Sequence, residues 1–391
     1  MEPQGHHDHL CHKAAILRRA RRVVIKVGSS ILSRQDGVNV ESVERLARDM
    51  AALRAGGQER GKEIVLVSSG AVAAGLGRLG IQLERSRTIP SKQAAAAVGQ
   101  IALMALYEQA FSRRGAHVGQ ILLTHDDVAD RGRYLNAKHT VQTLLENGVL
   151  PIVNENDSVA VEEIEFGDND NLSALVAVLI EADLLVILSD VEGLYEHDPR
   201  LHADARLVSL VERCDDALSY TTGAAGPLGR GGMTSKLQAA RKAALSGIPT
   251  IIADGRHDTS LPAVFSPDIP TGTLFLPVSD RITSRKHWIA YTLKPVGSLQ
   301  LDAGAADAVR RAGRSLLPAG VREIRGTFGV GDCVACVDDR GHEFARGLVN
   351  YHSAALEQIK GLKTSQIEQI LGYKVSDEVI HRDDLALLSD T

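Results

Sequence analysis

The chain has 391 residues, of which 44% are apolar and 24% are charged. This length and composition predict two or three globular domains with sizeable cores, and they exclude a chain that is disordered throughout. The formal net charge of −5 argues against a dedicated nucleic-acid binder, because such proteins neutralise phosphates with lysine and arginine. An anionic ligand would therefore have to be held by cations that are placed locally.

The amino-terminal residues and the cysteines bear on the cellular context. Residues 1–20 are polar and rich in histidine, and we expect a disordered extension there. The apolar run 14–17 is too short for a signal peptide, and no stretch approaches the roughly 18 apolar residues of a membrane span. The four cysteines are too few for a disulfide framework, and Cys333 and Cys336 lie in an apolar run that predicts a strand with buried thiols. A cytoplasmic protein is expected.

From residue 21 to about residue 255, short β-branched runs alternate with helical patterns. The predicted strands are mostly apolar on both faces and span residues 23–27, 63–67, 118–122, 149–154, 184–188 and 249–253. The predicted helices span residues 42–54, 91–111, 136–146, 172–181 and 233–246. Gly56, Gly148 and Gly247 follow helices where a left-handed residue would end them. The alternation predicts an α/β fold, a mostly parallel sheet in an αβα sandwich, with ligands at the carboxyl ends of the strands.

Past Pro277 the pattern changes to short strands, with tight turns at 331–332 and 338–341 and an alanine-rich helix near 304–313. We predict a small, mainly β domain over residues 296–374, a linker over 289–295 and a carboxyl-terminal tail over 375–391. The first domain is expected over residues 21–288. The second has balanced charge, no basic run and no aromatic stacking platform, so nucleic acid is not its expected ligand.

Two glycine patterns resemble nucleotide-binding loops but have the wrong context. Residues 56–62 nearly spell a Walker A loop, yet Glu63 stands where serine or threonine is needed and the segment precedes a strand, so we predict a surface turn. Residues 75–80 have the glycine spacing of a dinucleotide fingerprint, but no acidic residue closes a following strand about 20 residues on. Neither pattern predicts a cofactor site.

Two strand ends open into small-residue loops that suit an anion. Segment 25–30 (Ile-Lys-Val-Gly-Ser-Ser) places Lys26 at the end of a buried strand, and lysine is seldom buried without a partner. Its Gly-Ser-Ser turn lets backbone N–H groups approach an anion closely. Segment 67–71 (Val-Ser-Ser-Gly-Ala) repeats the arrangement around Ser69. A solvated lysine or an ordinary turn would look the same, so the two segments are informative mainly together.

Asparagine and aspartate are concentrated in two short loops. Residues 154–157 (Asn-Glu-Asn-Asp) end a strand, and residues 167–171 (Gly-Asp-Asn-Asp-Asn) precede an apolar helix. Asp168 or Asn169 is expected to cap that helix, but the seven Asn and Asp side chains of the two loops exceed what turns require. Amides suit the carboxylates of a zwitterionic ligand, and Asp157 suits its ammonium group. We predict substrate binding here.

Two further segments follow the strand over 184–188. Residues 189–195 (Ser-Asp-Val-Glu-Gly-Leu-Tyr) come directly after it, and residues 229–236 (Gly-Arg-Gly-Gly-Met-Thr-Ser-Lys) run into a helix with Lys236 in its first turn. A lysine is locally unfavourable at a helix amino terminus unless it serves an anion. Free N–H groups together with Thr234, Ser235 and Lys236 predict a phosphate cradle.

Taken in order, these five segments resemble the motifs of the amino acid kinase superfamily and, within it, of the glutamate 5-kinases, over about residues 21–288. The residues after about 296, with Ser-Leu-Leu-Pro-Ala-Gly at 315–320, look like the PUA domain of many bacterial glutamate 5-kinases. The resemblance implies ATP-dependent phosphorylation of the side-chain carboxylate of L-glutamate to glutamyl 5-phosphate, the first step of proline biosynthesis. It also implies Mg²⁺ alongside ATP. Ser29 stands where many relatives have threonine, which keeps the hydroxyl.

The resemblance further implies a role for each matching residue. Lys26 and Lys236 would contact the phosphates in the transition state, with Asp170 orienting both lysines. Glutamate would be bound by Ser69, Asp157 and Asn169. The ATP-binding residues would be Lys26, Ser189, Asp190, Arg230, Gly231, Gly232, Met233, Thr234, Ser235 and Lys236. No metal site made of protein side chains is implied.

The chemistry of the implied reaction is consistent with these residue types. A glutamate side chain is already ionised at neutral pH, so transfer needs no general base. The obstacle is repulsion between this carboxylate and ATP, so catalysis should rest on positioning and charge neutralisation. By resemblance alone, the labile acyl phosphate would pass to glutamate-5-semialdehyde dehydrogenase, proline would inhibit by feedback, and the chain would form a homo-oligomer.

Two alternatives remain open from the sequence. Another enzyme of the superfamily, such as an aspartate, acetylglutamate, carbamate or uridylate kinase, would share much of the motif set. An RNA-binding protein would use the PUA-like domain as its main ligand site, although the charge balance of that domain argues against it.

Overall fold

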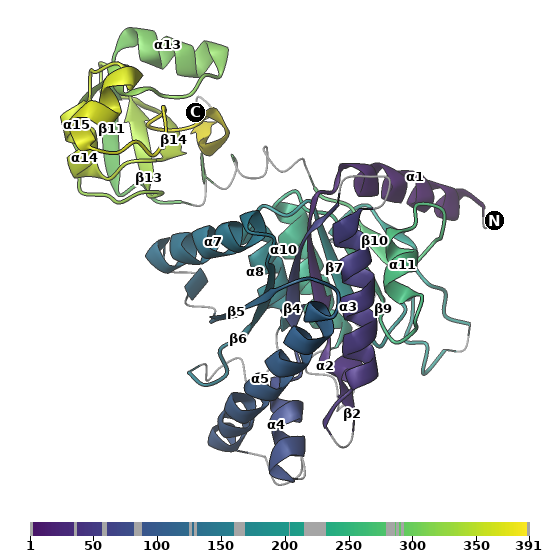
Figure 1. Cartoon of the computed structure of the whole chain (residues 1–391). Coiled ribbons are helices and arrows are strands. Elements are labelled where there is room, and N and C mark those ends of the chain that lie inside the picture. Colours follow the sequence, from purple (N-terminus) through teal and green to yellow (C-terminus); the bar gives the residue numbers. More distant parts are fainter. Residues whose placement is uncertain are drawn as a thin grey trace. The chain divides into compact units, whose positions relative to one another are not determined.

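The computed structural model describes residues 3–34, 37–56, 61–81, 88–124, 127–128, 131–159, 169–202, 204–214, 232–278, 286, 289–290 and 293–388. The chain divides into two compact units, Met1–Val278 and Ser279–Thr391. Figure 1 shows both units and labels most of their helices and strands.

An eight-stranded sheet forms the centre of the first unit, in the order β5-β6-β4-β1-β7-β9-β10-β8. Its strands are β1 (Arg22–Val27), β4 (Glu63–Ser68), β5 (Val118–Leu123), β6 (Leu150–Glu155), β7 (Leu184–Ser189), β8 (Leu210–Val211), β9 (Thr250–Asp254) and β10 (Thr273–Phe275). Every neighbouring pair is parallel except β9 with β10. The six predicted strands are present, and the mostly parallel α/β sheet is confirmed.

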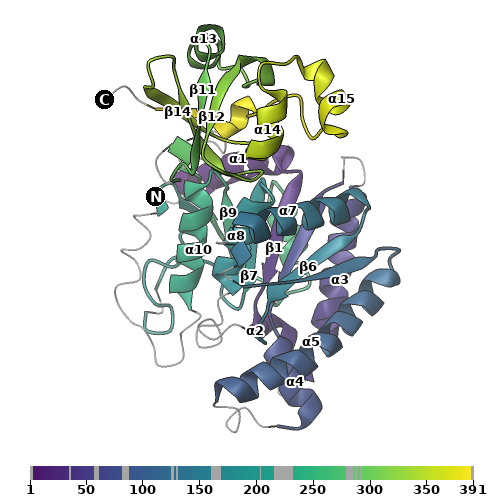
Figure 2. The same cartoon turned by 90° about the vertical axis from the view of Figure 1, so that its left-hand side faces the viewer.

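Helices cover both faces of this sheet, as Figures 1 and 2 show. One face carries α3 (Val40–Ala55), α5 (Ile89–Ser112) and α11 (Ser260–Phe265), and the other carries α7 (Arg131–Glu146), α8 (Asn169–Leu179) and α10 (Met233–Leu245). Side chains of β1 alternate between the two cores: Ile25 and Val27 face the first, while Val24 faces the second. Lys26 is therefore the last residue of β1 on the α8 and α10 side.

Glycines end the helices as the sequence predicts. Gly56, Gly148 and Gly247 have φ values of 75°, 70° and 76°, which lie in the left-handed region. The predicted surface turn that follows Gly56 falls on residues 57–60, which lie outside the described residues. Smaller elements of this unit are α2 (Ser29–Leu32), β2 (Ser33–Arg34), β3 (Gly37–Val38) and α4 (Ala71–Leu79).

The glycine pattern at 75–80 is explained by helix packing. A Cβ atom on Gly75 of α4 would lie 1.7 Å from the carbonyl oxygen of Ala95 on α5, and one on Gly99 of α5 would lie 1.8 Å from that of Ala71 on α4. The two helices therefore touch backbone to backbone, which only glycine allows. Gly80 ends α4 with a φ of 63°.

The amino-terminal segment differs from the predicted disorder, because residues 3–19 form helix α1 (Pro3–Arg19). The His9 Nδ1 atom lies 2.7 Å from the carbonyl oxygen of Ser209, and the Lys13 ammonium donates to those of Ala263 at 2.9 Å and Ile269 at 2.7 Å. Both side chains are fully buried. The segment looked like a solvated tail because the residues that anchor it are polar and their partners are distant in sequence.

The second unit is built on a five-stranded sheet with the order β12-β11-β13-β14-β15. Its elements are β11 (Gly297–Leu301), α13 (Ala303–Ala312), η4 (Pro318–Gly320), β12 (Val321–Arg325), β13 (Cys333–Val337), β14 (Glu343–Leu348), α14 (Ser353–Ile359), η5 (Thr364–Gln366), α15 (Ile367–Leu371), η6 (Arg382–Asp384) and β15 (Leu385–Leu387). The predicted mainly β module with its alanine-rich helix is confirmed. Cys333 and Cys336 are buried on β13 as thiols, not as a disulfide, and burial raises the pKa of Cys336 to about 12.

Two predicted limits of this unit do not match the structure. Ile289 and Ala290, which we expected in a linker, are buried and pack with Leu348. Ile380, which we expected in a loose tail, is fully buried, and β15 pairs antiparallel with β14. These segments bury only a few apolar residues each, so they lack the periodicity that identifies an element in a sequence. Among the described residues, no helix has both the length and the apolar character needed to cross a bilayer.

Candidate active site

The candidate site lies where four neighbouring parallel strands end. Strands β6, β4, β1 and β7 are adjacent in the sheet, and the Cα of Lys26 is in register with Val67 on β4 and Ile187 on β7. The carboxyl ends of these strands therefore meet at one edge, and helices α8 and α10 begin there with Asp170 and Lys236 in their first turns. This is the edge of an open α/β sheet where ligands bind.

Two lysines from different elements converge on one carboxylate at this edge. The Lys26 Nζ atom lies 2.5 Å from Asp170 Oδ1, and the Lys236 Nζ atom lies 3.2 Å from Asp170 Oδ2. All three residues are at most 6% exposed. The two ammonium groups are thus on the same side of the sheet and close to each other, although 210 residues separate them in the sequence.

Asp170 is held as a carboxylate by this environment. Burial alone would raise its pKa, but the charges of Lys26 and Lys236, together with hydrogen bonds from Lys26 and Ser235, outweigh burial and lower the pKa below its usual value. The Ser235 hydroxyl donates to Asp170 Oδ2 at 2.7 Å. Asp170 is therefore ionised at neutral pH and serves as an anchor for cations.

The turn after β1 borders the Lys26 ammonium. Gly28 is the N-cap of α2, and a Cβ atom built on Gly28 would lie 3.6 Å from Lys26 Nζ and 3.6 Å from Ser30 Oγ. The Gly28 N–H donates to the carbonyl oxygen of Leu188 at 3.1 Å, which fixes the turn to β7. Ser29 and Ser30 are exposed. The turn therefore places no side chain of residue 28 beside the Lys26 ammonium group.

A second cluster contains amides and a hydroxyl. The Asn169 side-chain NH₂ donates to Ser69 Oγ at 2.9 Å and to Asn154 Oδ1 at 3.1 Å. Asn169 is only 8% exposed, and its Oδ1 atom has no hydrogen-bond partner within the described part of the chain. A buried amide oxygen without a donor is costly, so this atom marks a candidate acceptor position in the site.

The remaining predicted residues that the structure describes lie at the ends of β6 and β7 and at the start of α10. Ser189 is buried at the end of β7, and its hydroxyl donates to Asp190 Oδ1 at 3.1 Å, while Asp190 itself is exposed. Gly232 is the N-cap of α10 and has no side chain to satisfy the first N–H groups, which Met233 and the exposed Thr234 contribute. Asp157 lies partly buried in the turn after β6. Arg230 and Gly231, like Asp168, fall outside the described residues.

One residue of the site has no counterpart in the sequence predictions. Gln100 on α5 accepts a hydrogen bond from the Asn154 side-chain NH₂ at 2.8 Å, and it thereby orients Asn154 toward Asn169. Gln100 is the sole polar side chain in the run 94–106 of helix α5. A single amide in an apolar helix is the signal that could have found it.

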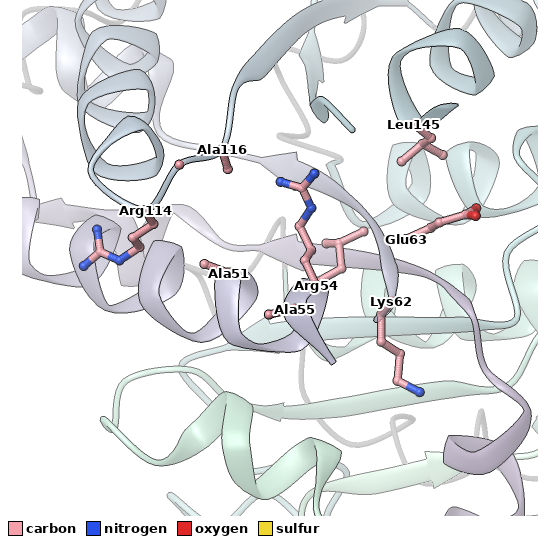
Figure 3. A pocket seen from close by; sticks show the side chains of 10 residues that line it. Ala51, Arg54, Ala55, Lys62, Glu63, Arg114, Ala116 and Leu145 are labelled. Atoms are coloured by element: carbon pink, nitrogen blue, oxygen red, sulfur yellow. The ribbon is translucent and has the colours of Figure 1, made fainter. Parts of the chain in front are cut away.

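The opposite edge of the sheet also carries cations, around a cavity of about 330 Å³ (Figure 3). Two of its cationic side chains bind carbonyl oxygens at helix ends. Lys62 donates to the carbonyl oxygens of Leu17 and Ala20 at 3.0 and 2.7 Å, and Arg54 donates to the carbonyl oxygen of Gly148. Arg114 pairs with a carboxylate, that of Glu44, at 2.8 Å. These cations have structural partners, and the cavity is remote from the strand ends that carry the predicted residues.

Comparison with known proteins gives two family matches and many relatives. Residues 21–254 match the model of the amino acid kinase family, and residues 297–371 match that of the PUA domain. The glutamate 5-kinase of Syntrophotalea carbinolica is 50% identical over 373 residues, which cover 95% of this chain and 98% of that protein. That of Caldanaerobacter subterraneus subsp. tengcongensis is 49% identical over 369 residues, covering 94% and 98%. Among solved structures, the UMP kinase from Bacillus anthracis aligns with a TM-score of 0.46 and 17% identity, covering 66% of this chain and 97% of that chain.

Proposed function

The chain belongs to the amino acid kinase family and, within it, to the glutamate 5-kinases, and from this premise we propose that Lys26, Lys236 and Asp170 form the centre of phosphoryl transfer. The enzyme uses ATP to phosphorylate the side-chain carboxylate of L-glutamate. The observation that carries the proposal is the convergence of two buried lysines on one carboxylate at the carboxyl ends of the strands.

Lys26 and Lys236 neutralise charge during transfer. A carboxylate nucleophile and the γ-phosphate of ATP repel each other, and ammonium groups in a poorly solvated site weaken that repulsion more than they would in water. Asp170 orients both ammonium groups through its two oxygens and keeps them close together. Asp170 takes no proton from the substrate, because the glutamate side chain is already ionised at neutral pH.

Ser69, Asn169 and Asp157 bind glutamate in this proposal. The Oδ1 atom of Asn169 offers an acceptor to the substrate ammonium, while the Ser69 hydroxyl, held by the Asn169 amide at 2.9 Å, offers a donor to a substrate carboxylate. Asp157 supplies a negative charge for the ammonium group. Glutamate would therefore lie beside the lysine cluster, since Asn169 and Asp170 are consecutive residues of α8.

ATP lies along the ends of β1 and β7 and the start of α10. Its phosphates would meet the Gly28 turn, Lys26, and the backbone N–H groups and side chains from Gly232 to Lys236, and its nucleoside would lie near Ser189 and Asp190. Arg230 and Gly231 would join them. The described residues hold no group of three or more His, Cys, Asp or Glu side chains placed to bind a metal ion. We propose that Mg²⁺ arrives on the ATP phosphates and shields their charge.

Further properties are proposed from the family. The acyl phosphate product is prone to hydrolysis and would pass to glutamate-5-semialdehyde dehydrogenase in proline biosynthesis. Proline would act as a feedback inhibitor, the chain would assemble as a homo-oligomer, and the enzyme would work in the cytoplasm.

An ATP-dependent hydroxamate assay tests the function and the substrate together. Acyl phosphates react with hydroxylamine to give a hydroxamate, which is measured as its coloured complex with iron(III). Activity with L-glutamate, and little with aspartate or acetylglutamate, is the expected result. A preference for aspartate or acetylglutamate would assign the chain to another branch of the family. Hydroxamate formed without ATP would contradict phosphoryl transfer.

A further inference from the structure

We propose that Arg45 is a positioning residue for the Gly28 turn of the kinase site. Arg45 lies on α3, and it acts through the loop between β9 and α11, which runs from Asp254 to Ser260. The inference rests on the proposed role of the Gly28 turn in holding ATP.

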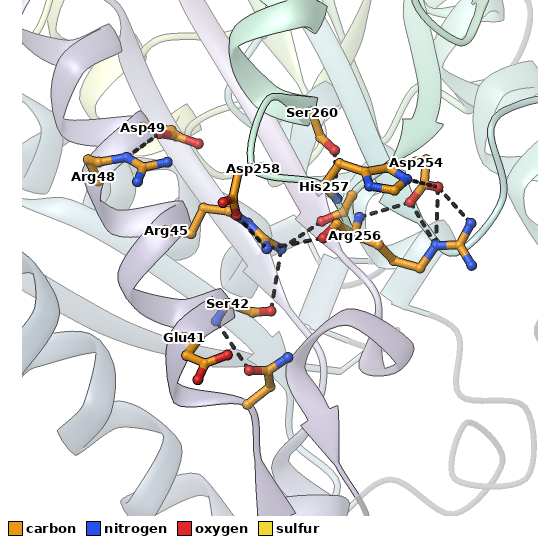
Figure 4. Close-up of polar contacts among 12 residues, drawn as sticks. Glu41, Ser42, Arg45, Arg48, Asp49, Asp254, Arg256, His257, Asp258 and Ser260 are labelled. Carbon is orange, nitrogen blue, oxygen red and sulfur yellow. Dashed lines mark hydrogen bonds and ion pairs between the residues drawn. The ribbon is translucent and has the colours of Figure 1, made fainter.

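Arg45 clamps this loop by its backbone (Figure 4). Its guanidinium donates to the carbonyl oxygen of Gly255 at 2.9 Å and to that of Arg256 at 3.1 Å, and it contacts Asp258 Oδ1 at 3.3 Å. It also donates to Ser42 Oγ, on its own helix, at 3.3 Å. The Arg45 side chain is 13% exposed. Because carbonyl oxygens of the loop are the main acceptors, the clamp fixes the path of the backbone.

Gly255, the residue that Arg45 holds, lies directly against the elements behind the ATP site. Its N–H donates to the carbonyl oxygen of Ser189 at 2.8 Å. A Cβ atom on Gly255 would lie 2.4 Å from Cδ1 of Ile31 on α2 and 2.9 Å from Cβ of Leu188 on β7. The loop can occupy this place only because residue 255 has no side chain.

The residues that contact Gly255 also hold the Gly28 turn. The Gly28 carbonyl oxygen accepts from the Ile31 N–H at 3.2 Å, and the Gly28 N–H donates to the Leu188 carbonyl at 3.1 Å. Ile31 and Leu188 are thus the two residues that touch Gly255 and also fix Gly28. A shift of the loop would move α2 relative to Lys26, whose ammonium borders the turn.

An arginine is suited to this task because its rigid fork carries several donors. It binds two consecutive carbonyl oxygens and still reaches Ser42 and Asp258, whereas a lysine has a single nitrogen on a flexible stem. Within the loop, Arg256 binds Asp254 through its backbone N–H at 2.8 Å and through its guanidinium at 2.7 Å. Arg256 thus stabilises the start of the loop locally, and only Arg45 of these two ties the loop to α3.

The first test compares Arg45→Ala and Arg45→Lys with Arg48→Ala. Arg48 lies one turn further along α3 and, within the described part of the chain, pairs with the neighbouring Asp49 at 2.9 Å, so it is the matched control. We expect Arg45→Ala to raise the KM for ATP roughly tenfold, with a smaller change in the KM for glutamate, because small misplacements of binding groups have effects of this size. Arg45→Lys should fall between Arg45→Ala and the wild type, and Arg48→Ala should match the wild type.

The second test uses the glycine contact and needs no change at Arg45. Gly255→Ala should raise the KM for ATP, as Arg45→Ala does. The double variant Gly255→Ala/Ile31→Val should have a KM for ATP between those of Gly255→Ala and the wild type, because valine lacks the Cδ1 atom that the new Cβ would meet. Ile31→Val alone should be close to the wild type. If Arg45→Ala does not fold, the comparison of Gly255→Ala with the double variant still tests the proposal.

The outcomes are distinguishable from failure of the kinase assignment. A wild-type enzyme that makes no hydroxamate from glutamate and ATP contradicts the proposed function. A normal wild-type enzyme contradicts this inference if Arg45→Ala lowers only the melting temperature and leaves both KM values unchanged at a temperature where it is folded. Failure of Ile31→Val to relieve Gly255→Ala contradicts the route through α2.

Discussion

Lysine and arginine gather at both edges of the large sheet, but they meet different partners there. At the amino-terminal edge, Lys62 binds the carbonyl oxygens that end α1, and Arg54 binds the carbonyl oxygen of Gly148, just past α7. At the carboxyl-terminal edge, Lys26 and Lys236 come from different elements and share Asp170. The first arrangement spreads cations over separate acceptors, and the second brings two cations together.

The difference supports a structural role for the first group of cations and the proposed role in phosphoryl transfer for the second. In α/β folds helices run back toward the amino ends of the strands, so their carboxyl ends collect at that edge, and cations there stabilise the helix dipoles. Two ammonium groups placed close together repel each other, and folding alone gives no reason to bring them together. Local rules are broken in this way at functional sites. The two groups of lysines therefore differ in their acceptors: Lys62 binds main-chain carbonyl oxygens, whereas Lys26 and Lys236 share a carboxylate.

The largest effect is expected from removing a lysine at the functional edge. Lys236→Ala should lower kcat by a factor on the order of 10² to 10³, because the ammonium group meets charge that develops during transfer. Lys62→Ala at the opposite edge is the control: it should leave kcat unchanged and reduce the free energy of unfolding by about 1–3 kcal/mol through loss of two charge-assisted hydrogen bonds. Steady-state kinetics and urea unfolding measure both. Equal loss of kcat in both variants would remove the distinction between the edges.

A smaller kinetic effect is expected at the glutamate side of the site. Asp157→Asn keeps the shape but removes the charge proposed to bind the substrate ammonium. We expect the KM for glutamate to rise by a factor that corresponds to about 1.5–3 kcal/mol of lost binding free energy, while the KM for ATP stays nearly unchanged. Ser158→Ala, the exposed neighbouring residue, serves as control. Loss of ATP binding in Asp157→Asn would place Asp157 elsewhere in the mechanism.

Lys13 offers a test of a buried structural cation through pH. Burial lowers the pKa of Lys13 from 10.5 to about 8. Because the unfolded chain then binds the proton more tightly than the folded one, stability rises as the pH increases from about 8 to about 10.5. Lys13→Met lacks this dependence, so the wild type should gain stability relative to the variant over that window, by something on the order of 1–3 kcal/mol. Urea unfolding at pH 7.5 and pH 10 measures it, and parallel curves would contradict a buried charged Lys13.

The smallest effect is expected from removing the second unit. All residues proposed for catalysis lie before Val278, where the first compact unit ends. A chain ending at residue 278 should therefore retain measurable kinase activity in the hydroxamate assay. A folded truncation with no activity would show that the second unit is required for catalysis.

The sequence singles out three residues that the structure brings together, Lys26, Asp170 and Lys236, but it predicts the limits of the fold less well. Lys26 and Lys236 are conspicuous without a structure because a lysine is unfavourable in a buried strand or in the first turn of a helix. Asp170 is conspicuous because its loop holds more Asn and Asp than turns require. Helix α1 and strand β15 were missed because their stability comes from single distant contacts, such as that of Lys13 with Ala263. Gln100 was missed for the same reason. Local patterns record local conformation, and they carry little information on which distant residues meet.

The most direct test of the central claim compares ground-state and transition-state binding in one variant. ADP with aluminium fluoride and glutamate imitates the phosphoryl group in transfer, and calorimetry can measure its affinity and that of ATP for the wild type and for Lys236→Ala. If Lys236 acts on developing charge, the variant should lose a factor on the order of 10² to 10³ for the mimic and much less for ATP. An equal loss for both ligands would mean that Lys236 only binds the nucleotide, which would contradict the account.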